Sequence, residues 1–293
     1  MANLKEIRIR IASVNSTQQI TKAMKMVSAA KLRRAQDAII QMRPYANKLK
    51  EILENVSGTL DSSTGGAYAA VRPVKKVLII AVTSNRGLCG GFNANIIRAV
   101  NAMIRENYSA QAQEGNVKVM CLGKKASDFF SKSKSLFLES HNDIYTNLSF
   151  DKVSPIAEQI MADFVAGKYD KIEVVYNQFK NAVVQFVTRE QVLPITPAEK
   201  KETTKMINDY IFEPDKEQIV LEIIPKSIKV QLYKATLDSH ASEHGARMTA
   251  MNKATDNAGE LLRGLRIFYN KARQAAITNE ILEIVGGANA LKG

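Results

Sequence analysis

The sequence predicts an α/β domain combined with a long coiled coil. The two ends of the chain carry heptad patterns of apolar residues, whereas the middle alternates short β-branched runs with amphipathic stretches. A helix with a heptad seam buries that seam only against another helix. We therefore expect the N- and C-terminal helices to form an antiparallel coiled coil beside a small Rossmann-like α/β domain.

The C-terminal segment, residues 216–293, has the longer heptad. Steps of three and four residues predict a seam of Met251, Ala254, Ala258, Leu261, Leu265, Phe268, Ala272, Ala275, Asn279 and Leu282. Pro225 should interrupt this helix near its start, because proline lacks the amide hydrogen that the helix needs. The last part of the segment should extend past its partner helix and present an apolar tip, which is stable only if another protein encloses it.

The N-terminal segment, residues 1–57, is the expected partner. Its first heptad runs through Leu4, Ile7, Ile11 and Val14, and a second runs through Ala35, Ala38, Met42, Tyr45, Leu49, Ile52 and Val56. Polar Gln18, Thr21 and Lys25 would fall on the seam between them, so the sequence predicts a stutter within residues 16–24. Pro44 should bend the helix. A mitochondrial leader can also be acid-poor and Arg-rich, but it has no reason to keep an apolar seam.

The middle segment, residues 74–193, has the periods of an open sheet. The expected strands are residues 75–82, 117–122, 136–139, 171–179 and 182–192, and the expected helices are residues 92–108, 123–133 and 154–166. Strands that alternate with helices and end in a hairpin, here with a tight turn at Lys180 and Asn181, predict a largely parallel sheet with one antiparallel edge. The polar segments 58–73 and 194–215 are expected to be linkers.

Composition restricts the class of partner. The net charge is +12, and residues 1–57 alone hold eleven lysines and arginines against four acidic residues. The coil should therefore meet an acidic surface. No aromatic residue is interleaved with these cations before Pro44, which argues against stacking on nucleic-acid bases. Cys89 and Cys121 are typical of reduced intracellular thiols, and no apolar run reaches the roughly 18 residues of a membrane span.

Two patterns suggest chemistry. The turn Arg86–Gly91 joins a strand to a helix, where an α/β domain could bind a phosphate, but it matches no standard phosphate-binding motif. His240, Glu243 and His244 fit the H-x-x-E-H zinc-protease pattern, yet a zinc site also needs a third ligand on another element and a cleft. We expect a structural turn, solvated histidines, and no catalytic site, metal or cofactor.

Several stretches resemble the γ subunit of F-type ATP synthases. They are Lys5–Val14 with Thr21–Met26, Ser84–Asn93, Ser242–Asn257 and Tyr269–Glu280. They occur in the family's order and span nearly the whole chain, which chance agreement does not explain. The resemblance implies a non-catalytic central shaft that turns inside a ring of three α and three β subunits. It also implies that the globular end rests on the membrane c-ring with the ε subunit, and that rotation couples proton or sodium translocation to ATP synthesis.

The resemblance also assigns contacts and a location. By this resemblance, the acidic lever loop of the β subunit would meet Met24 and Arg247. The α/β ring would be contacted farther up by Arg273, Gln274, Thr278 and Glu280. The c-ring and ε would be touched by Tyr210, Phe212 and Glu213. The family's position is peripheral, on the cytoplasmic side of a bacterial inner membrane, with no nucleic acid as partner.

Two other functions stay open at this point. The first is a nucleotide-binding α/β enzyme with a helical oligomerisation arm, whose melting temperature ATP or NAD would raise. The second is a basic coiled-coil protein that binds nucleic acid, with an affinity that falls steeply as salt is added.

Overall fold

The computed structural model describes residues 4–57, 66–195 and 216–290. They fall into two compact units, one made of residues 1–28 with 247–293 and the other of residues 29–246. Two long helices, α1 (Leu4–Ser57) and α6 (Lys216–Ala290), supply residues to both units. Within the described ranges, no helix is both long and apolar enough to cross a membrane.

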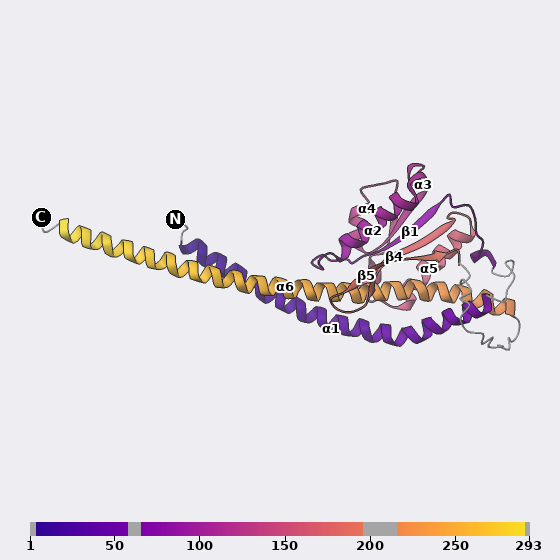
Figure 1. Ribbon diagram of the computed structural model, residues 1–293, viewed down its shortest axis with the longest axis horizontal. Coiled ribbons are helices and arrows are strands. Elements are labelled where there is room, and N and C mark those ends of the chain that lie inside the picture. The colour runs from indigo at the N-terminus through magenta and orange to yellow at the C-terminus, as the bar shows by residue number, and fades with distance from the viewer. Residues whose placement is uncertain (1–3, 58–65, 196–215, 291–293) are drawn as a thin grey trace. The chain divides into compact units, whose positions relative to one another are not determined.

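A five-stranded sheet forms the centre of the unit of residues 29–246 (Figure 1). Its strands are β1 (Val77–Val82), β2 (Val117–Leu122), β3 (Phe137–Ser140), β4 (Lys171–Phe179) and β5 (Gln185–Leu193). Their order is β3-β2-β1-β4-β5, and only β5 is antiparallel to its neighbour. The expected mixed sheet with one antiparallel edge is therefore confirmed.

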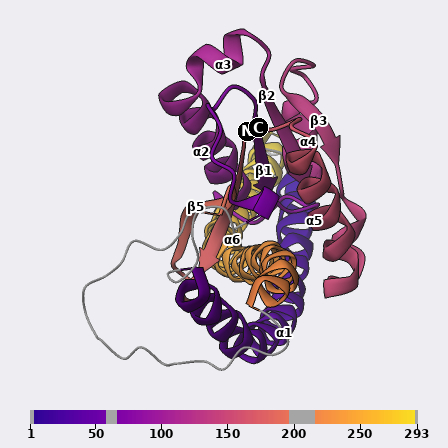
Figure 2. The same ribbon diagram turned by 90° about the vertical axis from the view of Figure 1, so that its right-hand side faces the viewer.

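Helices cover both faces of this sheet, as Figure 2 shows for α2 and α5. On one face, α2 (Phe92–Asn107) and α4 (Lys124–Phe130) pack on Val77, Ile79 and Ala81 of β1, with the short α3 (Ser109–Gln113) following α2. On the other face, α5 (Phe150–Val165) and α6 pack on Leu78, Ile80 and Val82. Because β1 is buried on both faces, its sequence is a continuous apolar run.

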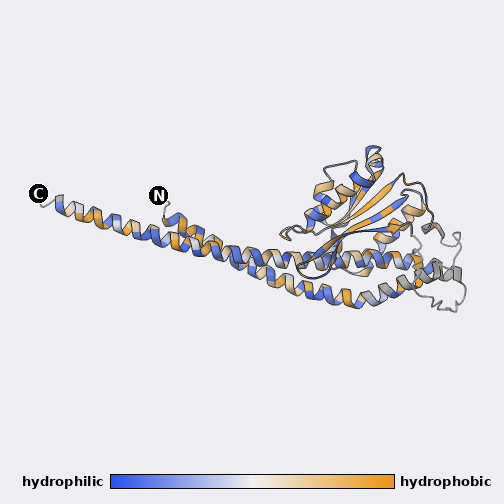
Figure 3. Cartoon of the chain, in the orientation of Figure 1, coloured by the Kyte–Doolittle hydropathy of each residue, from blue (hydrophilic) through white to orange (hydrophobic). Residues whose placement is uncertain are grey.

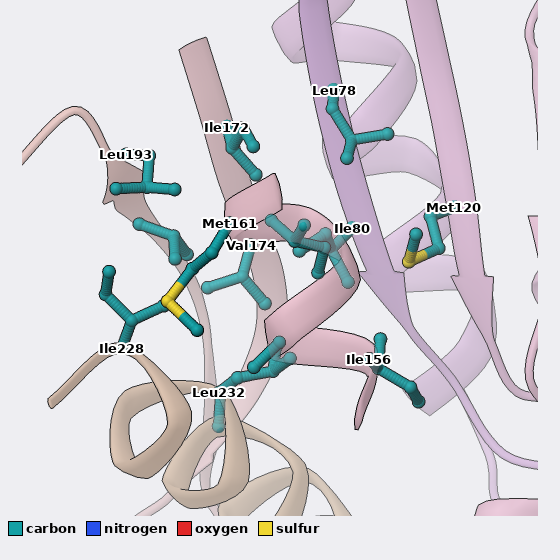
Figure 4. Packing of buried hydrophobic residues seen from close by; sticks show 14 of the residues in the cluster. Leu78, Ile80, Met120, Ile156, Met161, Ile172, Val174, Leu193, Ile228 and Leu232 are labelled. Atoms are coloured by element: carbon teal, nitrogen blue, oxygen red, sulfur yellow. The ribbon is translucent and has the colours of Figure 1, made fainter. Parts of the chain in front are cut away.

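The larger of the two cores joins α6 to the sheet. Figure 4 shows Ile228 and Leu232 of α6 against Met161 of α5 and the strand residues Ile172 and Val174. These side chains are almost fully buried. In Figure 3 the backbone is coloured by the hydropathy of each residue. The strands are mostly hydrophobic, whereas hydrophobic and hydrophilic residues are interspersed along α1 and α6. The described connections also contain two short 3-10 helices, Gly66–Tyr68 and Asp143–Thr146.

Two local expectations in this unit are wrong. The tight turn at Lys180 and Asn181 is a longer loop, because the Asn181 side-chain oxygen accepts hydrogen bonds from the amides of Val183 and Val184 at 3.0 and 2.7 Å. The break at Pro225 does not occur, since α6 continues through it. Burial of Ile224 and Ile228 on either side of Pro225 can offset the cost of a missing helix hydrogen bond, about 3 kcal/mol. Helix α1 also continues through Pro44, and the bend expected there stays a prediction.

The unit of residues 1–28 and 247–293 is an antiparallel pair of helices. Arg8 bonds to Tyr269, Gln18 to Thr255 and Lys25 to Asn252, so residue numbers rise along α1 as they fall along α6. The expected antiparallel pairing of the N- and C-terminal helices is confirmed in this unit. The tyrosine hydroxyl also raises the pKa of the Arg8 guanidinium through their hydrogen bond.

The seam of α6 differs from the expected one at every second position. The buried and half-buried residues at heptad spacing are Met251, Thr255, Ala258, Leu262, Leu265, Tyr269, Ala272 and Ala276. Leu261 and Phe268 are 45% and 49% exposed, and Ala275 is exposed too. Each of these three has a neighbour of the same kind that takes its place, so side-chain character alone could not choose between them.

The predicted stutter in α1 is also wrong. In this unit the inward positions are Ile7, Ile11, Val14, Gln18, Thr21, Lys25 and Ser28, an unbroken heptad in which polar residues simply occupy the seam. The same spacing continues in the other unit through Leu32, Ala35, Ile39, Met42, Ala46 and Leu49, while Tyr45 is 56% exposed. The polar residues are tolerated because they have hydrogen-bond partners.

Candidate functional site

The C-terminal part of α6 presents an exposed apolar end. Every residue in 277–289 is exposed, and Ile281, Ile284 and Val285 leave 54%, 71% and 50% of their surface uncovered. The predicted seam positions Asn279 and Leu282 are exposed as well. Large apolar side chains gathered on one bare helix are typical of a surface that another protein covers.

The four residues expected to contact the α/β ring lie along this part of α6. Arg273, Gln274, Thr278 and Glu280 are all exposed, and the Thr278 hydroxyl donates to the Gln274 carbonyl at 2.9 Å. The four side chains therefore lie at the helix surface, where the Thr278 hydroxyl donates its hydrogen within the helix.

The residues expected to meet the β subunit differ in burial. Met24 is half-buried, whereas Arg247 is only 7% exposed. The part of Arg247 that a partner could reach in this conformation is therefore small. Tyr210, Phe212 and Glu213, the residues expected to contact the c-ring and ε, lie outside the described residues.

A groove of about 380 Å³ lies between the paired helices of residues 1–28 and 247–293. Its lining is mostly polar or basic, and consists of Asn15, Gln18, Gly259, Leu262, Arg263, Arg266, Ile267 and Asn270. Gly259 opens the groove beside Gln18, because a Cβ at that position would lie 3.0 Å from the Gln18 amide nitrogen.

The glycine-rich turn after β1 is held by its own hydrogen bonds. The side-chain oxygen of Asn93 accepts from the amide of Ser84 at 2.9 Å, and the Ser84 hydroxyl donates to the Arg86 carbonyl at 2.6 Å. The buried Cys89 thiol accepts from the Asn93 side-chain amide at 3.2 Å. These hydrogen bonds hold the turn in its shape, which supports the structural interpretation.

The carboxyl end of β4 is occupied by α6. The Ser242 hydroxyl donates to the Asn177 carbonyl at 2.9 Å, and the Asn177 side-chain amide donates to the carbonyl of Phe92, the first residue of α2, at 3.3 Å. Open α/β sheets bind ligands outside the carboxyl ends of their strands, where the strand order reverses. Here that place, between β1 and β4, is taken by the chain's own side chains.

The expectation of solvated histidines is wrong. His244 is 5% exposed, its Nε2 lies 3.2 Å from Nε2 of His240, and the His240 ring stacks on Tyr145 at 6.0 Å. Burial and the nearby Glu243 raise the pKa of Tyr145 well above its usual range. In the described ranges, no cluster of three or more His, Cys, Asp or Glu side chains could hold a metal ion.

The sequence matches one family model and many known relatives. The model of the ATP synthase family, described as "ATP synthase", matches residues 3–291. The curated ATP synthase γ chain of Flavobacterium johnsoniae is 60% identical over 293 residues, covering 100% of both chains. This chain belongs to the ATP synthase γ subunit family. The γ chain of Christiangramia forsetii is 57% identical and that of Chlorobaculum tepidum 48% identical, each again over 100% of both chains.

Two chains in solved structures of mitochondrial ATP synthases have a similar fold. A chain from the central stalk and c-ring of the Tetrahymena thermophila mitochondrial ATP synthase is 27% identical, with a TM-score of 0.59 over 80% of this chain and 99% of that one. A chain of the Euglena gracilis mitochondrial ATP synthase, at 22% identity, has a TM-score of 0.69 over 98% of this chain and 94% of that one.

Membership of the γ family fixes the broad function. The chain is a γ subunit, a component of the central stalk of an ATP synthase, and it is a peripheral part of a membrane-associated complex. The alternative of a nucleotide-binding enzyme is not favoured by these findings.

Sequence reasoning missed one feature of the paired helices, the hydrogen bonds across the seam at Gln18, Thr21 and Lys25. The signal was present, because these residues continue the heptad of Leu4, Ile7, Ile11 and Val14 without a break. A glycine at position 259, inside a helix that has no need of one, was a second signal.

Proposed function

We propose that this γ subunit is the rotor shaft that couples proton or sodium translocation through a c-ring to ATP synthesis in an α3β3 ring, without a catalytic site of its own. The observation that carries the proposal is the bare apolar end of α6, residues 277–289, beyond a tightly paired stretch of two helices. A rod can transmit torque only if it is stiff, and paired helices with small seam residues pack closely. A rod that turns in a socket also needs contacts that exchange easily.

The proposed contacts follow from exposure and charge. Arg273, Gln274, Thr278 and Glu280 offer exposed polar groups to the α/β ring, where an exposed ion pair contributes only about 0 to 1 kcal/mol and so can be replaced during rotation. Met24 supplies a partly exposed apolar contact to the β subunit, with Arg247 as a largely buried support. We assign Tyr210, Phe212 and Glu213 to the c-ring and ε by position in the family alone.

The proposed location is the cytoplasmic face of a bacterial inner membrane. Support comes from the relatives, since the curated γ chains of Flavobacterium, Christiangramia and Chlorobaculum are bacterial and match this chain from end to end. We propose that the chain consists of five parts: helix 1–57, linker 58–73, α/β domain 74–193, linker and foot 194–215, and helix 216–293.

The test is co-expression with candidate α and β subunits. We expect a stable complex that hydrolyses ATP, whereas the isolated chain should hydrolyse none. ATP hydrolysis by the purified chain alone would contradict the non-catalytic role, and failure to form any complex would contradict the rotor role.

Substitutions at two methionines of α1 can distinguish a coupling role of Met24 from a packing role. Met24 is half-buried and Met26 is 61% exposed, and they lie two residues apart on the same helix. Met24→Lys should lower the ATP made per translocated ion, measured in membrane vesicles that hold the whole complex, more than it lowers the yield of complex. Met26→Lys is the matched control and should change neither. Equal losses of coupling and assembly in Met24→Lys would mean that Met24 only packs.

A further inference from the structure

We propose that six residues across the seam fix the register of α1 against α6, and so position the contact end of α6 for the rotor function. They form a register layer, defined as Gln18, Thr21 and Lys25 of α1 with Asn252, Thr255 and Gly259 of α6. The inference rests on the proposed rotor function for its consequence, but the register itself can be measured without that function.

The centre of the register layer is a pair of threonines. The Thr255 and Thr21 hydroxyl oxygens lie 2.8 Å apart across the seam. Each also lies within hydrogen-bond distance of a carbonyl of its own helix, Thr255 2.8 Å from the Met251 carbonyl and Thr21 3.0 Å from the Gln18 carbonyl. Thr21 is 9% exposed, so its hydroxyl depends on these partners rather than on water. A buried hydroxyl that loses its partner costs about 1 to 3 kcal/mol.

The second contact of the register layer is made by the Gln18 side chain, which needs open space on α6. The Gln18 side-chain amide crosses the seam and donates to the Thr255 carbonyl at 3.3 Å. The gap is made by Gly259, where a Cβ would lie 3.0 Å from that amide nitrogen. A glycine inside a helix costs about 1 kcal/mol relative to alanine, so its presence here has a local cost that the glutamine contact explains.

The third contact of the register layer is made by the charged side chain of Lys25. The Lys25 ammonium donates to the side-chain oxygen of Asn252 at 2.5 Å, and the Asn252 amide donates to the Asp256 carboxylate at 3.1 Å. The two bonds orient the amide and link a half-buried lysine to an acidic group. The three contacts therefore use three different kinds of donor, each matched to its own partner.

This matching distinguishes the native register from its neighbours. In the native pairing Thr21 faces Thr255, Gln18 faces Gly259 and Lys25 faces Asn252. A shift of one heptad toward the C-terminus would set Thr21 against Leu262 and Gln18 against Arg266, so the bond between the two threonine hydroxyls and the bond from the Gln18 amide to the Thr255 carbonyl would both be lost. The apolar seam on its own discriminates weakly, because three of its positions, Ala258, Ala272 and Ala276, carry the same small side chain. A polar residue in a coiled-coil seam is known to specify register at a cost in stability.

A shifted register would also move the exposed residues of α6 that are proposed to contact the α/β ring. One heptad of helix is about 10 Å long, so a shifted register would displace Arg273, Gln274, Thr278 and Glu280 by that distance relative to Met24. Two groups of residues that must meet one ring at fixed heights could then not both do so. The register layer is thus a positioning device, and none of its residues needs to touch a partner.

Disulfide trapping tests the register directly. In the full chain with Cys89→Ala and Cys121→Ala, Ile11→Cys is combined with a second cysteine at Leu265 for the native register, or at Ala258 or Ala272 for shifts of one heptad. We expect the parent to form only the 11–265 disulfide. With Gln18→Leu, Thr21→Val, Lys25→Leu, Asn252→Leu and Thr255→Val added, the shifted disulfides should rise at least tenfold. An unchanged pattern in that variant would overturn the proposal.

Smaller changes keep the test decisive if the fivefold variant does not fold. Thr21→Val with Thr255→Val should already raise the shifted disulfides, whereas Thr21→Ser with Thr255→Ser, which keeps the hydroxyls, should not. The control exchanges apolar seam residues as Val14→Ile with Leu262→Ile and should keep a single register. Shifted disulfides in the serine pair or in the apolar control would count against a role for the hydroxyl bonds.

The functional readout is the ATP made per translocated ion in the assembled complex. The valine pair should lower this ratio more than it lowers the yield of complex, and the serine pair should restore it. If the disulfide pattern shifts but no complex forms with any version of the chain, the rotor function fails and the register layer stands. If the pattern stays native while the complex couples normally, the register layer fails alone.

Discussion

The two units of the molecule achieve specific packing in opposite ways. In the unit of residues 29–246, the side chains of β1 are fully buried and entirely apolar, and shape alone locates them between α2 and α5. In the unit of residues 1–28 and 247–293, half of the seam is small or polar, and hydrogen bonds such as Thr255 to Thr21 identify the partners. The comparison shows that a thick core can be specified by volume, whereas a two-helix seam needs polar contacts to be unique.

The space around two glycines, Gly123 and Gly264, also differs between the units. A Cβ on Gly123 would lie 2.1 Å from the Thr83 carbonyl oxygen, and Gly123 has a φ of 118°, where other residues are strained. Gly264 in α6 has no heavy atom within 4 Å of the place its Cβ would take. There is no room for a methyl group at Gly123, whereas there is ample room at Gly264.

The largest expected effect compares these two glycines. Gly123→Ala should lower the free energy of unfolding by about 3 kcal/mol, because the backbone of β1 or β2 must move. Gly264→Ala should instead raise it by about 1 kcal/mol, since alanine is the better helix former. Urea unfolding of the full chain, followed by circular dichroism, measures both. Changes of the same sign would break the contrast between the units.

A second prediction concerns the phase of the seam. Leu262 is 5% exposed and its neighbour Leu261 is 45% exposed, so the two leucines form a matched pair. Leu262→Ala should cost about 2 kcal/mol of stability, at the low end for buried leucines because only one helix packs on it in this unit. Leu261→Ala should change stability by less than about 0.5 kcal/mol. The reverse ranking in thermal unfolding would mean that the originally expected seam is the real one.

The smallest expected effect is electrostatic and belongs to the sheet unit. The Lys229 ammonium lies 2.6 Å from a Glu158 carboxylate oxygen and lowers the pKa of that carboxyl. A lowered pKa means that the ionised carboxylate stabilises the fold above the pKa of the unfolded state, and that this contribution is lost as the pH falls through the folded-state pKa. Glu158→Gln should therefore lower the melting temperature slightly at neutral pH and not at all in strong acid.

Glu222→Gln is the control for that prediction. Glu222 pairs with Lys226 four residues along the same helix, and both side chains are largely exposed, so its loss should matter even less. A melting temperature of Glu158→Gln that runs parallel to the parent from pH 7 to the acid limit would show that the ion pair does not contribute.

Sequence patterns located the sheet much better than the seam. β2 and β4 begin and end at the expected residues, because each is rich in buried apolar residues and is bounded on both sides by polar residues or glycine. The seam of α6 was only half right, since Leu261 and Leu262, or Ala275 and Ala276, are equivalent until the partner helix is known. The five-residue loop after β4 was missed because Asn181 builds it with its side chain.

The candidate contact surface shows a different limit of sequence reasoning. Exposure of Arg273 or Glu280 follows from the helix, but nothing in the residues themselves says which protein lies opposite. That information came from the resemblance to the γ family. Burial of Arg247 could not be anticipated either, because an arginine on a coiled-coil helix ordinarily keeps its charge in water.

The uncovered end of α6 also has a consequence for the supply of this protein in the cell. A single helix with exposed isoleucines unravels readily in water, so a newly made copy offers a ready point of attack to a protease until its neighbours arrive. Surplus copies would be removed and enclosed copies spared. The abundance of the chain would then be matched to that of its binding partners by degradation, with no need for a separate regulator.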